Sequence, residues 1–159
     1  MSWDDDEATK YWNQTRHDTN EYNKRTTNIE EQGILCKLQF QQDTTHSSVT
    51  DPFYYLRVTF PPNFKHLIKP EAVKQKEETP TGFHISLGNK TNFDDNYYLQ
   101  NELKHIQQKY HQPQTILIKH MYVARSSVIN IIPPDPLYYE LKNLVYQGTW
   151  KNDVHISLD

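Results

Sequence analysis

Cysteine, glycine and long apolar runs are scarce in this sequence, and each scarcity excludes a class of protein. One cysteine, Cys36, excludes an intrachain disulfide and a zinc site built from several thiolates. Four glycines leave no room for a glycine-rich phosphate-binding loop. No apolar run approaches the roughly 20 residues of a membrane-spanning helix, and the acidic N-terminus lacks the apolar core of a signal peptide. We therefore expect a cytoplasmic protein that makes no membrane contact, with the nucleus as the open alternative.

Positive charge is also scarce, because 17 Lys and Arg stand against 20 Asp and Glu, which gives a formal net charge of −3 at pH 7. Proteins that coat nucleic acid non-specifically need many cationic contacts to phosphates, so this class is excluded, whereas a local basic or histidine-lined pocket stays open. Only 35% of the 159 residues are hydrophobic, but 13% are aromatic and supply large buried areas. The length suits one compact domain.

Hydrophobic periodicity divides the chain into a polar N-terminal arm over residues 1–30 and a domain over 31–159. Alternating or continuous short apolar runs predict strands at 34–41, 53–60, 83–87, 115–123 (as one strand or two), 127–132 and 154–158. Helical spacing predicts a short helix after Pro70 and longer helices over 95–112 and 136–147. Strands and helices that alternate in this way favour an α+β fold.

Capping residues locate the ends of the two longer helices. Asp94-Asp95 is expected to cap the first of them, whose apolar stripe starts at Tyr98. Asp135-Pro136 has the form of an N-cap followed by proline at the first helical position. Gly148 fits the C-terminal end of that second helix.

One tetrapeptide occurs twice, as His84-Ile85-Ser86-Leu87 and as His155-Ile156-Ser157-Leu158. A chance repeat of this size in such a chain is about a one-in-ten event, so its content and context carry the interpretation. Each copy lies in a short apolar strand that follows a turn. Alternate residues of a strand face the same side, so in each copy His and Ser share one face while Ile and Leu point into the core.

The residue types of this repeat suit phosphoryl chemistry. Two imidazoles with an ordinary pKa near 6.5 can divide acid–base work at neutral pH, because one takes a proton while the other gives one. Two hydroxyls can donate hydrogen bonds to the non-bridging oxygens of a phosphate. If the two strands lie near each other, His84, Ser86, His155 and Ser157 form one catalytic surface. The alternative is that two strands carry a surface His beside a Ser by chance.

The motif His-x-Ser-hydrophobic, present twice, resembles that of the 2H phosphoesterase superfamily, which includes LigT-type RNA ligases and cyclic phosphodiesterases. The resemblance extends over residues 53–159. It implies an α+β, LigT-like bilobal domain, in which pseudo-twofold related antiparallel sheets are flanked by helices and enclose a central cleft. It also implies a metal-independent phosphodiesterase, active as a monomer on RNA, an oligonucleotide or a cyclic nucleotide.

Two departures from the family leave the substrate open. Many relatives have another strand after the second motif, and here either residues 33–42 take that edge of the sheet or the form is minimal. A row of cationic residues near the pocket is also hard to identify. One alternative is a viral or phage enzyme that degrades 2′,5′-oligoadenylate or cyclic-oligonucleotide messengers. Others are a non-catalytic nucleotide- or RNA-binding module of the same fold and a protein-interaction domain.

Three further residues are candidates for substrate binding. Tyr122 and Trp150 could stack on a base, although core packing is the competing role for any aromatic residue. Arg57 could contact a phosphate. The other histidines lack the spacing of a metal site, so we expect no metal ion and no cofactor.

Overall fold

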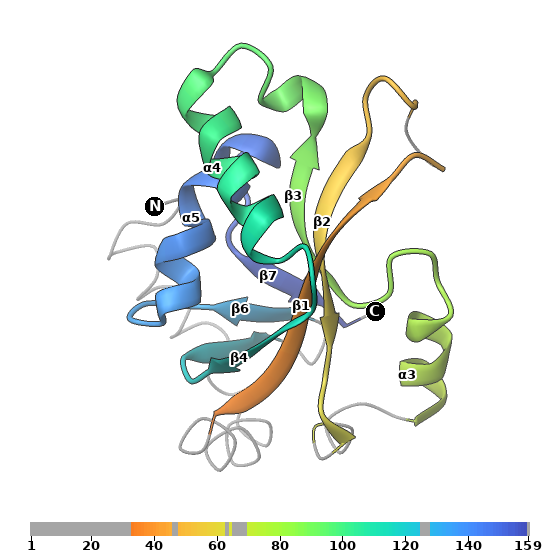
Figure 1. Cartoon of the computed structure of the whole chain (residues 1–159). Helices are drawn as coiled ribbons and strands as arrows, with labels where there is room; N and C mark the ends of the chain where they lie inside the picture. The colour runs from red at the N-terminus through yellow and green to blue at the C-terminus, as the bar shows by residue number, and fades with distance from the viewer. Residues whose placement is uncertain (1–32, 46–47, 63, 65–69, 125–127, 159) are drawn as a thin grey trace.

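The computed structural model describes residues 33–158 except 46–47, 63, 65–69 and 125–127. The arm predicted over residues 1–30 lies outside these ranges. The described elements, labelled in Figure 1, are β1 (Ile34–Asp43), β2 (Phe53–Thr59), α3 (Pro70–Glu77), β3 (His84–Asn89), the 3₁₀ turn η2 (Lys90–Asn92), α4 (Tyr97–Lys109), β4 (Gln114–Ile118), β5 (Met121–Ala124), β6 (Val128–Ile131), α5 (Pro136–Gly148) and β7 (His155–Ser157).

The described strands form two antiparallel sheets, one in the order β3-β2-β1-β4 and one in the order β5-β6-β7. The predicted α+β class is therefore confirmed. The apolar run over 115–123 forms two strands, of which β4 belongs to the first sheet and β5 to the second. Residues 33–42 do not take an edge beside the second motif, because β1 is an interior strand of the sheet that holds the first motif.

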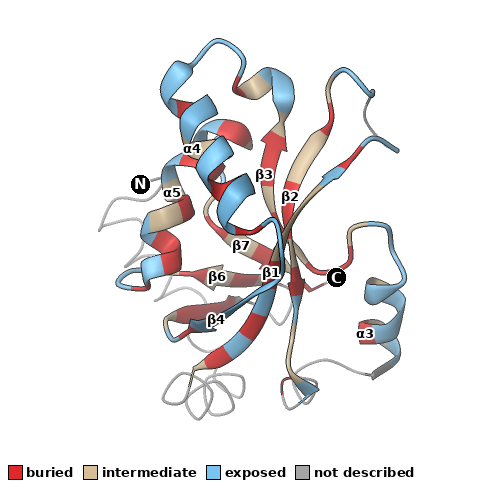
Figure 2. Cartoon of the chain, viewed as in Figure 1, coloured by how far each residue is buried: buried red, intermediate tan, exposed pale blue. Residues whose placement is uncertain are grey.

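Both sheets and the helices α4 and α5 bury their apolar faces in one continuous core. Figure 2 shows buried positions on the strands of both sheets and on the two helices. The alternation predicted for β1 is present, since Ile34, Cys36 and Leu38 are buried while Leu35 and Lys37 are exposed. In β1 one face is thus committed to the core, and Leu35 and Lys37 lie on the other.

The start of α4 differs from the prediction. Its N-cap is Asn96, whose side chain accepts a hydrogen bond from the backbone N–H of Leu99 at 3.1 Å, rather than Asp94 or Asp95. Tyr98 does not belong to the buried stripe, because it is 78% exposed. Asn and Asp are comparably good N-caps, so residue type alone did not distinguish Asn96 from the two residues before it.

Asp135 caps α5 as predicted, and it also joins the two sheets. Its buried carboxylate accepts hydrogen bonds from the backbone N–H of Leu137 at 3.0 Å, of Lys119 at 2.8 Å and of His120 at 3.1 Å. The last two residues form the turn between β4 and β5. One carboxylate therefore fixes the start of α5 against the point where the chain passes from one sheet to the other.

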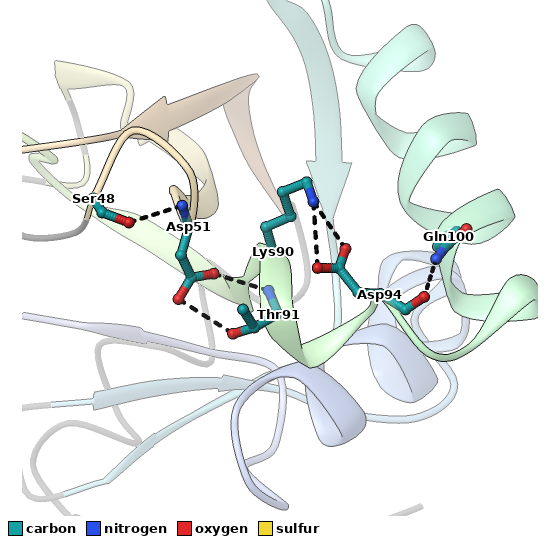
Figure 3. A network of polar contacts seen from close by, with 6 residues as sticks. All are labelled: Ser48, Asp51, Lys90, Thr91, Asp94 and Gln100. Carbon is teal, nitrogen blue, oxygen red and sulfur yellow. Dashed lines mark hydrogen bonds and ion pairs between the residues drawn. The ribbon is translucent and has the colours of Figure 1, made fainter.

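The far end of β3 is tethered to the β1–β2 loop, as Figure 3 shows. The carboxylate of Asp51 accepts hydrogen bonds from the backbone N–H of Thr91 at 2.8 Å and from its hydroxyl at 3.2 Å. Lys90 and Asp94 form an exposed ion pair at 3.1 Å across the same turn. These contacts hold β3 in place beside β2 after its motif has ended.

The backbones of β3 and α5 touch where Gly88 meets Gly148. A Cβ on Gly148 would lie 1.9 Å from the carbonyl oxygen of Leu87, and one on Gly88 would lie 2.1 Å from the carbonyl oxygen of Gly148. Gly88 also has a φ of +124°, which few residues with a side chain adopt. Gly148 thus fits the helix end for a different reason from the one predicted, since close packing rather than a left-handed cap requires it.

We expect Gly148→Ala to lower the free energy of unfolding by about 1–3 kcal/mol, because its methyl group would overlap backbone atoms that cannot move alone. Helix propensity alone predicts the opposite sign, a gain of about 1 kcal/mol. Urea denaturation decides between them. The exposed neighbour Gln147→Ala is the control and should stay within about 0.5 kcal/mol of wild type. A stabilised Gly148→Ala would show that the contact is loose.

Candidate functional site

The two His-x-Ser motifs adopt the alternation expected of strands. His84 begins β3 and His155 begins β7, and both imidazoles are half-buried. The isoleucine after each histidine is buried in the core, at 0% exposure for Ile85 and 1% for Ile156. Each serine returns to the face of its histidine, where it is also half-buried. The prediction of shared His and Ser faces is confirmed in both strands.

The motifs belong to different sheets, yet their strands lie side by side. β3 is the edge of the first sheet and β7 the edge of the second, and the two edges are in contact. The charge of His155 is close enough to His84 to contribute to lowering the pKa of that imidazole. The structure therefore brings the two predicted catalytic histidines into one electrostatic neighbourhood.

Both imidazoles are held in the same way. Nδ1 of His84 lies 2.8 Å from the carbonyl oxygen of Gly82, and Nδ1 of His155 lies 2.7 Å from the carbonyl oxygen of Asp153. A carbonyl oxygen only accepts, so Nδ1 carries the hydrogen in each ring and Nε2 holds the lone pair of the neutral form. In each motif the histidine ring is thus hydrogen-bonded to the backbone carbonyl two residues before it, and Nε2 is the ring atom left to exchange protons.

Burial lowers the pKa of His84 from its ordinary value, because the positively charged imidazolium loses hydration. The hydrogen bond to Gly82 acts in the opposite direction, and the positive charges of Lys76, His155 and Arg57 lower the pKa further. The ordinary value is near 6.5, so a lowered value leaves the Nε2 lone pair of His84 free of its proton at neutral pH.

Two aromatic rings pack around His84. The ring of Tyr55 lies 5.5 Å from the imidazole at 71°, and that of Phe53 lies 6.1 Å away at 88°. The two rings stack on each other at 5.6 Å. Phe53 was missed in the sequence, although alternation along β2 places it on the same face as Tyr55. The missing information was the pairing of β2 with β3.

Arg57 lies directly opposite His84 in the β2–β3 register. Its guanidinium donates hydrogen bonds to two carbonyl oxygens, those of Glu77 and Pro80, each at 3.3 Å. Contact with a substrate phosphate stays a prediction for this residue. The structure adds that Arg57 binds the loop which leads into β3.

Of the two predicted stacking residues, one lies on the face of His155 and the other in solvent. Tyr122 is opposite Asn130, which is opposite His155, so all three side chains occupy the same face of the second sheet. Tyr122 is only 3% exposed, however. Trp150, on the connection from α5 to β7, is 85% exposed.

Asn130 is a further polar residue that the sequence analysis missed. It interrupts an otherwise apolar strand and is half-buried beside His155. Alternation predicts that it faces away from Ile129 and Ile131, which are in the core. A polar residue at this position was therefore a detectable signal for the functional face.

Other chemistry is limited among the described residues. Cys36 is buried, and its burial raises the pKa of the thiol to about 12, which keeps it protonated and unreactive. In the part of the chain that the structure describes, no group of three or more His, Cys, Asp or Glu side chains is placed to hold a metal ion. None of the described helices has the length and apolar character that crossing a bilayer requires.

Compared with known proteins, the chain matches no family model, no curated protein and no solved structure. The functional interpretation therefore depends on the geometry of the two motifs. Two paired observations define that geometry: the strands β3 and β7 are in contact, and each histidine makes the same bond to the carbonyl two residues before it.

We expect both histidines to be Nδ1–H tautomers when neutral, because each Nδ1 donates to a carbonyl oxygen. Ring-nitrogen chemical shifts at pH 8, measured by long-range ¹H–¹⁵N correlation, report the tautomer directly. The exposed His105 on α4 provides an internal reference in the same spectrum. A predominant Nε2–H form of either His84 or His155 would contradict this geometry.

Proposed function

We propose that the protein is a metal-independent phosphodiesterase that cleaves a phosphodiester bond by acid–base catalysis between His84 and His155. The observation that carries the proposal is the matched geometry of two His-x-Ser strands in contact. Identical Nδ1 bonds point to one task for both rings, which is proton exchange at Nε2. One such surface histidine has many explanations, whereas a matched and adjacent pair has few.

The fold supports the proposed kinship with 2H phosphoesterases. Each antiparallel sheet contributes one motif, and the motif is at the start of the edge strand in both. This is the arrangement expected of two pseudo-twofold related lobes with the reacting groups where they meet. We therefore propose a LigT-like bilobal domain, in which β1 is an added interior strand of the first sheet.

The proposed reaction moves two protons. Neutral Nε2 of one histidine takes the proton of a ribose 2′-hydroxyl while its oxygen attacks phosphorus. Protonated Nε2 of the other histidine gives its proton to the leaving oxygen as that P–O bond breaks. The products are a cyclic phosphate and a free hydroxyl, and the pair has exchanged protonation states. In the hydrolytic version, water replaces the ribose hydroxyl.

The serines would stabilise the charge that builds on phosphorus oxygens. Ser86 and Ser157 share the faces of the two histidines, so each can donate a hydrogen bond to a non-bridging oxygen. The cations Arg57 and Lys76, near His84, would add favourable electrostatics for an anionic substrate. Although cations are scarce in the whole sequence, positive charge is thus present beside His84.

RNA, oligonucleotides and cyclic nucleotides are the proposed substrates, with immune messengers such as 2′,5′-oligoadenylate as the narrower alternative. A panel of 2′,3′-cyclic nucleotides, 2′,5′-oligoadenylate, cyclic dinucleotides and short RNA, incubated in EDTA, separates these possibilities. Binding without turnover across the whole panel would indicate the non-catalytic nucleotide-binding module instead.

We expect His84→Ala and His155→Ala each to lower turnover by about 10²–10⁴-fold with folding nearly intact, because each removes a proton-transfer group. Ser86→Ala and Ser157→Ala should cost less, about 10–10³-fold, since one hydrogen bond to phosphate is lost. His105→Ala, on the exposed side of α4, is the matched control. A turnover rate near that of the wild type in either His84→Ala or His155→Ala would contradict the two-histidine mechanism.

We expect the rate to follow a bell in pH and to be insensitive to EDTA. One imidazole must be neutral and the other protonated, so the rate falls on both sides of an optimum. The pKa of His84 is lowered, so a limb that reports this group as the base lies below about 6.5, and the rate falls as pH drops through it. Initial rates from pH 4.5 to 9, with and without chelator, measure both. A monotonic rise with pH, or abolition by EDTA, would contradict the mechanism.

A further inference from the structure

The loop between α3 and β3 (residues 78–83, the α3–β3 loop) is fastened from two directions. Arg57, on β2, donates to the carbonyl oxygens of Glu77 and Pro80. Within the loop, the hydroxyl of Thr79 donates to the carbonyl of Lys76 at 2.6 Å and accepts from the backbone N–H of Gly82 at 3.1 Å. The loop therefore has a fixed path between the end of α3 and the first residue of β3.

Arg57 also lies against the residue that holds His84. Gly82 has a φ of +60°, and a Cβ there would be 2.8 Å from Nη2 of Arg57. The guanidinium thus occupies the space that any side chain at this position would need. The carbonyl of the same glycine accepts the bond from Nδ1 of His84 at 2.8 Å. Contacts run without a gap from Arg57 through Gly82 to the imidazole.

We propose that Arg57 is a positioning residue, which holds the Gly82 carbonyl against Nδ1 of His84, and that the cations beside this ring, Arg57 among them, make His84 the base and His155 the acid of the pair. Only the two catalytic roles rest on the proposed function; the positioning of the ring does not. This role differs from the direct phosphate contact that the sequence suggests for Arg57.

The charges around His84 favour the neutral ring that a base requires. The charged groups that act on it are Arg57 from β2, Lys76 from α3 and His155 from β7, and each is a cation or becomes one on protonation. The neighbouring rings of Phe53 and Tyr55 carry no charge. Every one of these cations disfavours a second positive charge on His84.

The surroundings of the second histidine differ at the corresponding point. The carbonyl that accepts the bond from Nδ1 of His155 is the backbone carbonyl of Asp153. Two rings are thus held by the same bond, and in the first motif the accepting residue, Gly82, lies against a guanidinium. A difference of this kind is what separates the acid from the base in a pair of like groups.

Titration of the histidine rings by NMR tests the proposal without requiring turnover. We expect Arg57→Met to lower the pKa of His84 further and to reduce its Nδ1–H tautomer, because the bond to Gly82, which this change weakens, raises that pKa by more than the Arg57 charge lowers it. Lys76→Met removes a cation but leaves the loop fastened, so it should raise the pKa and preserve the tautomer. Lys104→Met, exposed on α4, is the control for net charge and should change neither.

Arg57→Lys keeps the charge but lacks the planar fork that reaches two carbonyls, so we expect a loss of tautomer preference and a lower pKa of His84. It also covers the case in which Arg57→Met fails to fold. A His84 titration and tautomer unchanged in Arg57→Lys and in folded Arg57→Met would overturn the proposal, whether or not the protein is an enzyme.

Kinetics on a reacting substrate then test the assignment of base and acid. With Arg57→Lys we expect kcat to fall roughly 10- to 100-fold at pH 7 with little change in KM, because the base is misplaced by a small distance. In Arg57→Met the acidic limb of kcat should move to lower pH along with the NMR pKa of His84. A rise in KM with unchanged His84 titration would instead make Arg57 a direct phosphate ligand.

Discussion

The site depends on the contact between two glycines. Gly88 lies one residue before the end of β3, which begins with His84, and Gly148 ends α5, which leads into His155. Because neither has a side chain, the backbones of β3 and α5 meet directly. That contact holds the end of β3 against α5, the helix that leads into β7. Proton transfer through one substrate requires the two imidazoles to lie near each other, and packing between the elements that carry them is thus a condition for chemistry on the surface.

The histidines of the two motifs make matching hydrogen bonds, and the first of them also has cations beside it. Each Nδ1 is fixed by a carbonyl two residues back, which any strand preceded by a turn can supply. Cations stand beside the first histidine, because β2 and α3 bring Arg57 and Lys76 to it. A pair of identical residues can therefore do opposite work when the elements packed around each one differ.

Alternation and capping predicted much of the fold, because those signals are local. The faces of His84 and His155, the buried Cys36 and the Asp135 cap of α5 follow from spacing and residue type alone. The position of β1 inside the first sheet did not, since strand order depends on contacts between distant segments. Gly148 was assigned to a helix end by its type, but its role in packing required the position of β3. Phe53 and the bonds of Arg57 likewise needed the pairing of strands, whereas alternation alone puts Asn130 on the outer face and pairing adds only its place opposite His155.

We propose that His84 and His155 act together in one reaction step. The most direct measurement compares the turnover of His84→Ala, His155→Ala and the double variant on the same substrate in EDTA. Residues that work as a unit are strongly non-additive, so the double variant should be little slower than the slower single one. If the two losses multiply in full, the histidines act independently, and the claim is contradicted.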